Sequence, residues 1–171
     1  VFHVTKRKIS ERISSKVDRD GNFELTNYTS GFYMPSDKVV RHYDAGDFQE
    51  AVELATIADD PREEEELYRR AVDLYKAPFL VTLDMPWVNE RRAQLRMLHG
   101  QALIGLGRIH KARDEKEEAI GLFVRGLKET PGREDIAREV ISLYAEMGML
   151  DDAKSQFKHL EAYLKTKKLK P

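Results

Sequence analysis

Apolar residues at helical spacing begin at the start of the chain. Phe2, Ile9 and Ile13 recur at intervals of seven and four, which places them on one face of a helix over residues 2–14. On a helical wheel Lys6 borders this stripe, and His3 lies to the side. The positions that point away from it are Val4, Arg7, Lys8 and Glu11. The pattern predicts a short helix with one buried stripe and a largely basic outer face.

Two short β-prone runs follow. Residues 23–26 (FELT) and 32–34 (FYM) flank a loop at 27–31 that contains Gly31. Runs of this kind around a Gly-containing loop are typical of a β-hairpin. Pro35 ends the second run because its ring removes a backbone donor.

Helical periodicity returns further along the chain. Residues 45–58 place Phe48, Val52 and Ala55 on one face, and Pro61 opens a second helix that extends to residue 76. That second helix is expected to bury four residues: Leu67, Ala71, Leu74 and Tyr75. The sequence Lys-Ala-Pro-Phe at 76–79 breaks the pattern, residues 80–84 are expected to be irregular, and Pro86 starts a long helix that ends near residue 112. Trp87 is expected to lie in the core.

An internal repeat of 34 residues begins in this long helix. The matched positions are Leu106 with Val140, His110 with Tyr144, Asp114 with Gly148, Ala119 with Ala153, and Phe123 with Phe157. A 34-residue period with a fixed Ala and an aromatic four residues later is the tetratricopeptide pattern. Two antiparallel helices pack closely at Ala or Gly, and the aromatic fills the gap against the next repeat. Gly107, Pro131 and Gly148 fall where such a repeat has a close contact, a stop and a turn.

The repeat predicts the architecture of most of the chain. Residues 46–55 resemble the second half of an earlier, degenerate repeat. Because such repeats bury their faces against neighbours, we expect a continuous helical stack from about 44 to 164. The predicted fold class is therefore mainly α, with antiparallel helix pairs preceded by a helix and a β-hairpin.

Composition narrows the range of functions. The 171 residues are 41% hydrophobic and 35% charged, with a formal net charge of −1. The absence of Cys excludes disulfides and thiolate chemistry, and fits a reducing cytoplasm. No apolar run approaches the roughly 20 residues that span a bilayer. His99 and His110 share a helix face, but no acid stands at ligand spacing with both of them, and no catalytic motif is found. We therefore expect neither an enzyme nor a metal or other cofactor.

Charge is unevenly distributed along the chain. Residues 1–43 carry eight Lys or Arg against five acids, residues 44–66 carry ten acids and one Arg, and residues 154–171 carry six Lys and one Glu. Such segregation indicates that the two ends meet polyanions. The alternative is that each cluster is only a solvated helix face.

The segment 71–98 resembles a known family. Its Lys-Ala-Pro-Phe-Leu sequence, the acidic-Pro-Trp motif at 84–87, the long helix and the repeats are similar to the bacterial transcriptional activator domain, over residues 44–171. In that family the helical domain usually follows a winged-helix DNA-binding domain. Residues 1–36 resemble the recognition helix and wing of such a domain, with 37–43 as a linker, although 31–34 read Gly-Phe-Tyr-Met instead of the usual Gly-Tyr-Arg-Leu. Because the chain starts at Val1 inside an apolar pattern, we expect a fragment of a longer regulator.

The resemblance implies candidate DNA contacts. Residues at the start of a recognition helix enter the major groove, and wing residues reach phosphates. The helix residues are His3, Val4, Lys6, Arg7 and Lys8, and the wing residues are Asn27, Thr29 and Ser30. The alternative is that 5–8 is a soluble helix face without a DNA role. For this fragment alone we expect no sequence-specific binding at physiological salt.

The resemblance also implies a partner surface. The first helix of each pair would line a concave face, with non-packing positions that bind a peptide, a partner domain such as one of RNA polymerase, or a second copy. These positions are Gln101, Ile104, Arg108, Lys111, Asp135, Arg138 and Ser142. Two alternatives stay open: the groove is filled by the chain's own helices, or the protein is a tetratricopeptide-type adaptor without a DNA role.

Phe79, Leu80 and Trp87 are expected to form a buried bridge, so that Trp87→Ala would cost about 3–5 kcal/mol.

Overall fold

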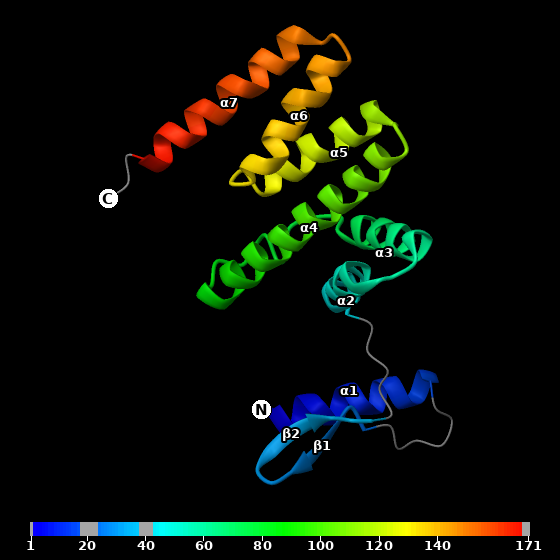
Figure 1. The fold of residues 1–171 in the computed structure, drawn as a ribbon. Coiled ribbons are helices and arrows are strands. Elements are labelled where there is room, and N and C mark those ends of the chain that lie inside the picture. Colours follow the sequence, from blue (N-terminus) through cyan, green and yellow to red (C-terminus); the bar gives the residue numbers. More distant parts are fainter. Residues whose placement is uncertain (1, 18–23, 38–42, 169–171) are drawn as a thin grey trace. The chain divides into compact units, whose positions relative to one another are not determined.

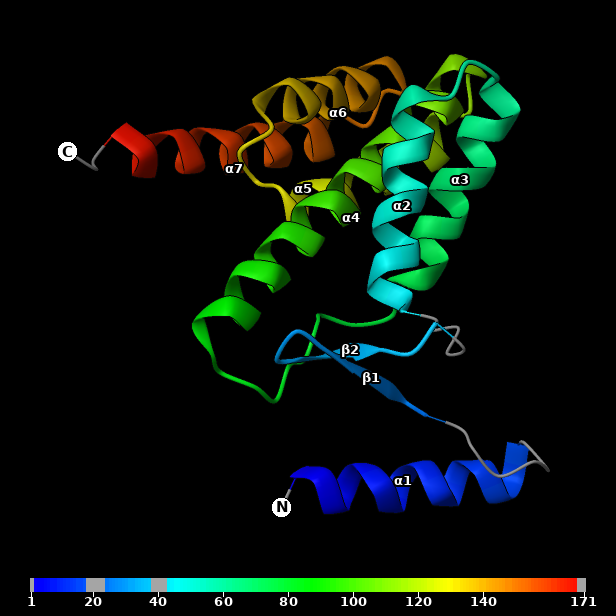
Figure 2. The ribbon, with the colours of Figure 1, turned by 90° about the horizontal axis from the view of Figure 1, so that it is seen from below.

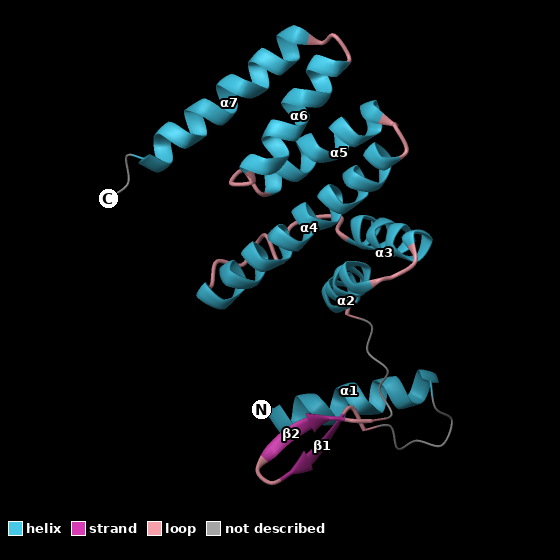
Figure 3. Cartoon of the chain, in the orientation of Figure 1, coloured by secondary structure: helices cyan, strands magenta, loops and turns pink. Residues whose placement is uncertain are grey.

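The computed structural model describes residues 2–17, 24–37 and 43–168, without the side chains of residues 2, 3, 17 and 168. It separates into two compact units, Val1–His42 and Tyr43–Pro171. Each unit is described by itself, and Figures 1 and 3 show the elements of both.

The described residues of the first unit form one helix and one hairpin. Helix α1 spans Phe2–Val17, and strands β1 (Thr26–Thr29) and β2 (Phe32–Pro35) pair antiparallel, with Thr26 opposite Pro35 and Thr29 opposite Phe32. Ser30 and Gly31 form the connection with φ of 53° and 87°. Positive φ at both central residues is the geometry of a type I′ turn, which matches the twist of a hairpin.

This tight turn changes the predicted limits of the hairpin. The sequence placed residues 27–31 in a loop, whereas Asn27, Tyr28 and Thr29 lie in β1 and only Ser30 and Gly31 turn. The first strand therefore lies three residues later than predicted. The hairpin is tied to α1 by Lys6, whose Nζ donates to the Thr26 carbonyl at 2.8 Å and lies 5.2 Å from the centre of the Tyr33 ring.

The second unit is a stack of helices that pack in antiparallel pairs. Over its described residues the helices are α2 (Asp44–Ile57), α3 (Pro61–Leu74), α4 (Pro86–Ala112), α5 (Lys116–Glu129), α6 (Glu134–Glu146) and α7 (Leu150–Lys168). The pairs are α2 with α3, α4 with α5 and α6 with α7. Figure 2 shows α2 and α3 side by side at one end of this unit. Residues 46–55 thus lie in the first helix of a pair, whereas the sequence had suggested the second.

Local chemistry explains where these helices begin and end. The Asp60 carboxylate accepts a hydrogen bond from the Arg62 amide at 3.0 Å and caps α3, and Pro61 and Pro86 occupy first turns. The turns after α4 and α6 contain Asp114 and Gly148, with φ of 61° and 75°. These two residues are equivalent in the 34-residue repeat, so both repeats turn at the same position.

The core confirms the predicted faces of α2. Phe48, Val52 and Ala55 are buried there. In α3 the prediction is partly wrong, because Tyr68 and Ala71 are the buried residues. The other expected core residues of that helix, Leu67, Leu74 and Tyr75, are only half-buried.

Helix α4 is the centre of the stack. It packs against α2, α3 and α5, and residues 102–107 are buried without interruption. Gly105 lies against the Tyr68 ring of α3, and Gly107 lies against the Phe123 ring of α5. Small residues therefore let two neighbours approach α4 closely, as the repeat pattern predicts for position 107.

The predicted buried bridge at 79–87 is wrong in its main residue. Trp87 is 54% exposed and Leu80 is 42% exposed, and Phe79 alone is half-buried. The segment is held instead by Arg92, whose guanidinium donates to the carbonyls of Phe79 at 2.8 Å, Leu80 at 2.7 Å and Leu83 at 3.1 Å. A single side chain of α4, Arg92, thus fixes the preceding loop by binding the loop's backbone carbonyls.

We therefore expect Trp87→Ala to lower the free energy of unfolding by only about 1 kcal/mol, because half of the indole is already in water. Arg92→Ala should lower it more, since three backbone acceptors lose a charged donor. Urea unfolding followed by far-UV circular dichroism measures both. A larger loss for Trp87→Ala than for Arg92→Ala would contradict this assignment.

Candidate functional site

The exposed face of α1 is basic, as predicted. Val4, Arg7 and Lys8 are exposed, and Arg7 forms an ion pair with Glu11 at 2.7 Å. Sequence reasoning missed Arg12 and Lys16, which are exposed as well and continue from Lys8 at intervals of four residues. The spacing could have identified this stripe. Lys8, Arg12 and Lys16 place three positive charges along one line of the helix.

Two other candidates on α1 have different positions. Lys6 is half-buried and turns to the hairpin, where it bonds the Thr26 carbonyl, so it stands apart from the exposed basic face. The side chain of His3 lies outside the described part of the structure. The basic surface of this helix is therefore Arg7, Lys8, Arg12 and Lys16.

The candidate wing residues lie on the exposed part of the hairpin. Asn27 and Thr29 are two residues apart in β1 and share one face, opposite Met34 and Phe32 of β2. Ser30 is in the turn, and all three candidates are exposed. Phe32 is 72% exposed on the same hairpin face. The exposed face near the tip of the hairpin therefore combines polar side chains of β1 with apolar side chains of β2.

The candidate partner positions on the helical unit fall into three groups. Gln101 lies on the side of α4 that faces α2, and its amide donates to the Thr56 hydroxyl at 3.0 Å. Arg108 and Lys111 reach from α4 to α6, where they form ion pairs with Asp135 at 3.8 Å and Glu139 at 2.5 Å. Arg138 and Ser142 are exposed on α6.

Ile104 does not belong to this surface. It is 2% exposed and packs in a core cluster with Phe123, Ile136 and Val140. The expectation that it is a non-packing position is wrong, because α6 and α5 close over this part of α4. Helical periodicity does not predict exposure correctly here, because neighbouring helices cover α4 on several faces.

A groove of about 460 Å³ opens between α2, α4 and the start of α6. Gln101 is at one side, and Glu53, Arg91 and Arg133 bring charges of both signs to it. Met97 lines the groove and is 65% exposed. Two apolar side chains, Met97 and Leu98, among amide and charged groups of both signs form a surface that suits a peptide segment.

The described residues of the helical unit can also be compared with what a metal site or a membrane span requires. Within the described residues no group of three or more His, Cys, Asp or Glu side chains could hold a metal ion. None of the described helices combines the length and apolarity that crossing a bilayer requires. His99 stacks on the Tyr75 ring with centroids 4.1 Å apart, and burial lowers the pKa of its imidazole. His110 contacts Glu115 at 2.5 Å.

The family model of the bacterial transcriptional activator domain matches residues 43–169, about three quarters of the chain. The chain belongs to this family. No curated protein and no solved structure matches it. The match covers the whole helical stack and stops before the first unit, whose resemblance to a winged helix stays a prediction. This activator domain is a regulatory module, and its family is not an enzyme family.

A carboxylate network fixes the first helix pair of the activator domain to the second. Glu65 on α3 accepts from Arg69 at 2.7 Å and from Arg113, which follows α4. These bonds lower the pKa of Glu65 to about 2 from the ordinary 4.5, and the hydrogen bond from Arg113 contributes more than the hydrogen bond from Arg69. Arg69 also reaches His110 at 3.5 Å. The pairing therefore links α3 to the turn between α4 and α5.

Acid should weaken the activator domain through Glu65. Its pKa is lower in the folded chain, so the stabilisation is complete above about pH 4.5 and is lost as pH falls toward about 2. In Glu65→Gln, melting temperature should fall less steeply over that window than in the wild type. Thermal melts at successive pH values measure this, with exposed Glu66→Gln as the matched control. Equal slopes for Glu65→Gln and wild type would contradict the assignment.

Proposed function

We propose that this chain acts in a bacterial transcriptional regulator of the cytoplasm, in which α1 and the hairpin contact DNA and the helical unit binds a protein. The family supports the regulatory context. The observation that carries the DNA part is the line of cations Lys8, Arg12 and Lys16 on the exposed face of α1, beside Arg7.

The expected DNA contacts follow from these positions. Cations along one helix face neutralise phosphates and release counterions, which gives affinity that falls with salt. Val4 is 59% exposed near the start of α1, where it would meet a thymine methyl if the helix enters the major groove. Asn27, Thr29 and Ser30 on the hairpin would bond phosphate oxygens.

The test uses the natural gene product that contains this chain and DNA from upstream of its own gene. Arg7→Ala plus Lys8→Ala should weaken binding and reduce the slope of log affinity against log salt by about 0.9 for each lost phosphate contact. Arg70→Ala plus Lys76→Ala is the control, because it removes the same charge from exposed positions in α3 and in the segment that follows it. Unchanged binding for the first variant, or no binding of any upstream fragment, would contradict a DNA role.

A second function, that of a protein-binding adaptor, is favoured by the groove between α2, α4 and α6. There Met97, Gln101 and Arg133 offer apolar, amide and cationic contacts together. DNA retention distinguishes the two functions, because an adaptor without a DNA role would be indifferent to changes at Arg7 and Lys8. Both functions use the helical unit for association with protein, including a second copy or RNA polymerase.

A further inference from the structure

An open groove lies on the last helix pair, between α6 and α7. It has a volume of about 490 Å³ and lies between α6, which contributes Arg138 and Ile141, and α7, which contributes Phe157, Glu161 and Leu164. Phe157 is 57% exposed there. Large apolar side chains at a concave surface are the usual mark of a binding site for an apolar segment.

The internal repeat shows what such a groove holds. Phe123 is the equivalent of Phe157 one repeat earlier, and it is completely buried. Its groove is occupied by α6, which inserts Ile136, Val140 and Leu143, spaced four and three residues apart, into the cluster around Phe123. The groove at α6 and α7 therefore has the form that accepts the first helix of a following pair.

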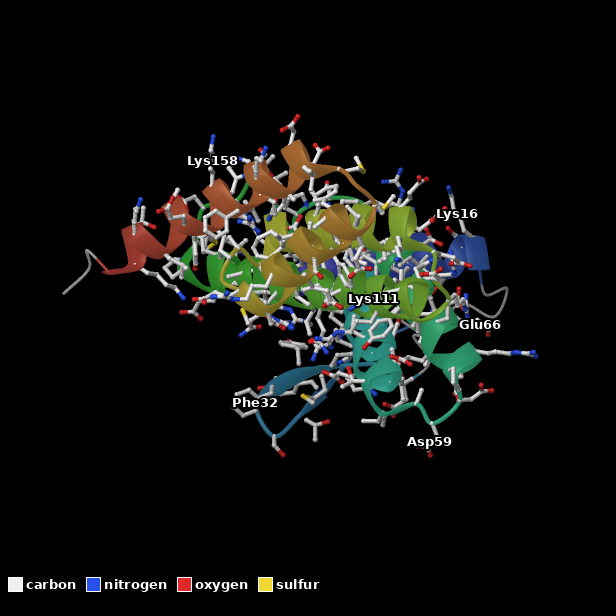
Figure 4. All side chains as sticks on the ribbon, turned by 45° about the horizontal axis from the view of Figure 1, so that its top comes forward. Lys16, Phe32, Asp59, Glu66, Lys111 and Lys158 are labelled. Atoms are coloured by element: carbon white, nitrogen blue, oxygen red, sulfur yellow. The ribbon has the colours of Figure 1, made fainter. Side chains whose placement is uncertain are left out.

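The outer face of α7 selects the charge of that helix. Where α5 has Ile120 and Val124, α7 has Lys154 and Lys158, and Lys165 lies two turns further along. Lys154 has Asp151 at 3.4 Å and Lys165 has Glu161 at 2.9 Å. Within the described structure Lys158 has no carboxylate at ion-pair distance, and Figure 4 shows it extending away from α7. The occupant should thus combine an apolar stripe with acidic residues.

The other end of the same stack presents such a helix. In α2 the outward positions Glu50, Leu54 and Ile57 are spaced four and three residues apart, as are the inserted residues of α6. Leu54 is 43% and Ile57 is 74% exposed. Glu53 is also exposed on this side, and the turn after α2 carries Asp59 and Asp60. Helix α2 is the first helix of its pair, as α6 is.

We propose that the helical unit associates head to tail, with the Glu50–Leu54–Ile57 face of α2 from a second copy seated in the α6–α7 groove. This inference rests on the proposed role of the helical unit in protein association and names the partner. Leu54 and Ile57 cover Phe157, and Glu50 and Glu53 approach Lys154 and Lys158. Because α2 and α7 lie at opposite ends of the unit (Figure 1), the contact joins two different surfaces and extends the stack.

A symmetric contact of α7 with α7 is disfavoured by the same charges. It would place Lys154, Lys158 and Lys165 of one copy against the same lysines of the other. Like charges in close apposition are destabilising, whereas the acidic α2 face is complementary. The association should weaken as salt screens these charges.

Sedimentation of the full 171-residue chain tests the proposal over about 1 µM to 1 mM, the range of weak interfaces. We expect the mean mass to rise above the 19.8 kDa of one chain as concentration increases. Phe157→Asp blocks the groove and Ile57→Asp blocks the α2 face; each should weaken self-association about tenfold or more. Both residues are exposed, and circular dichroism verifies that the variants fold. Val81→Asp, at a residue 63% exposed in the loop before α4, should associate like the wild type.

Mixing the two blocked variants gives the deciding result. Each retains one intact surface, so an equimolar mixture should form a one-to-one dimer at concentrations where either variant alone stays largely monomeric. A wild type that stays monomeric, a mixture that stays monomeric, or an Ile57→Asp chain that associates as the wild type does would overturn the proposal. Failure of the natural gene product to bind upstream DNA would be a separate result. It would contradict the proposed DNA role and would not change the masses that sedimentation gives for the 171-residue chain.

Discussion

Replacing Phe123 by Ala should lower the free energy of unfolding by about 3–5 kcal/mol, the usual cost of deleting a fully buried aromatic side chain. The ring is completely buried between α4 and α6, where it contacts Gly107 and the cluster of Ile104, Ile136 and Val140. Its removal leaves a cavity that the neighbouring helices cannot close without shifting. Urea unfolding followed by far-UV circular dichroism measures the loss.

The repeat supplies a matched control for this prediction. Phe157 occupies the equivalent position in the next repeat but is 57% exposed, so Phe157→Ala should cost less than about 1 kcal/mol at concentrations where the chain is monomeric. The two substitutions remove the same atoms from the same place on two equivalent helices. Equal losses would show that burial at this position does not depend on a following helix.

The repeat positions were the most predictable part of the structure. Ala119 and Ala153 are buried, and Asp114 and Gly148 both turn with positive φ. Equivalent positions meet the same requirement in both repeats, a small side chain at the first pair and a left-handed backbone at the second. The helices that Pro61 and Pro86 open begin at those residues. A local backbone requirement is visible in one sequence, since only a few residue types satisfy it.

Burial at particular positions was less predictable. The sequence does not state how many neighbours cover a helix, so helical spacing predicts Ile104 on an exposed stripe although α5 and α6 cover it. The break in periodicity at 76–84 predicts a buried bridge that contains Trp87, whereas this indole is half exposed and Arg92 holds the loop through its backbone carbonyls. A side chain that bonds distant carbonyls leaves no periodic signal.

The candidate surfaces followed the same division. The basic face of α1 was predictable from helical spacing, and the structure adds Arg12 and Lys16 to it. The inward turn of Lys6 was not, because it depends on the register of a hairpin that lies twenty residues away. The open groove beside Phe157 was also invisible to the repeat alignment, which treats Phe123 and Phe157 as equivalent.

Adding a single methyl group at Gly107 should destabilise the helical unit, because overpacking a core typically costs about 1–3 kcal/mol. A Cβ at this position would lie 2.5 Å from the nearest carbon of the Phe123 ring. That ring is fixed on its other side by α6, so it cannot move away without opening the cluster around Ile136 and Val140. The loss should exceed the gain of about 1 kcal/mol that Ala normally brings to a helix in place of Gly.

The same substitution at Gly121 should have the opposite sign. Gly121 is exposed on α5, and no atom lies within 4 Å of a Cβ built there, so Gly121→Ala should raise the free energy of unfolding by about 0.5–1 kcal/mol. Urea unfolding of both variants compares identical changes in chemistry that differ only in available space. If Gly107→Ala were stabilising as well, the close approach of α4 to α5 would not depend on a glycine, and the repeat would owe its geometry to the alanines alone.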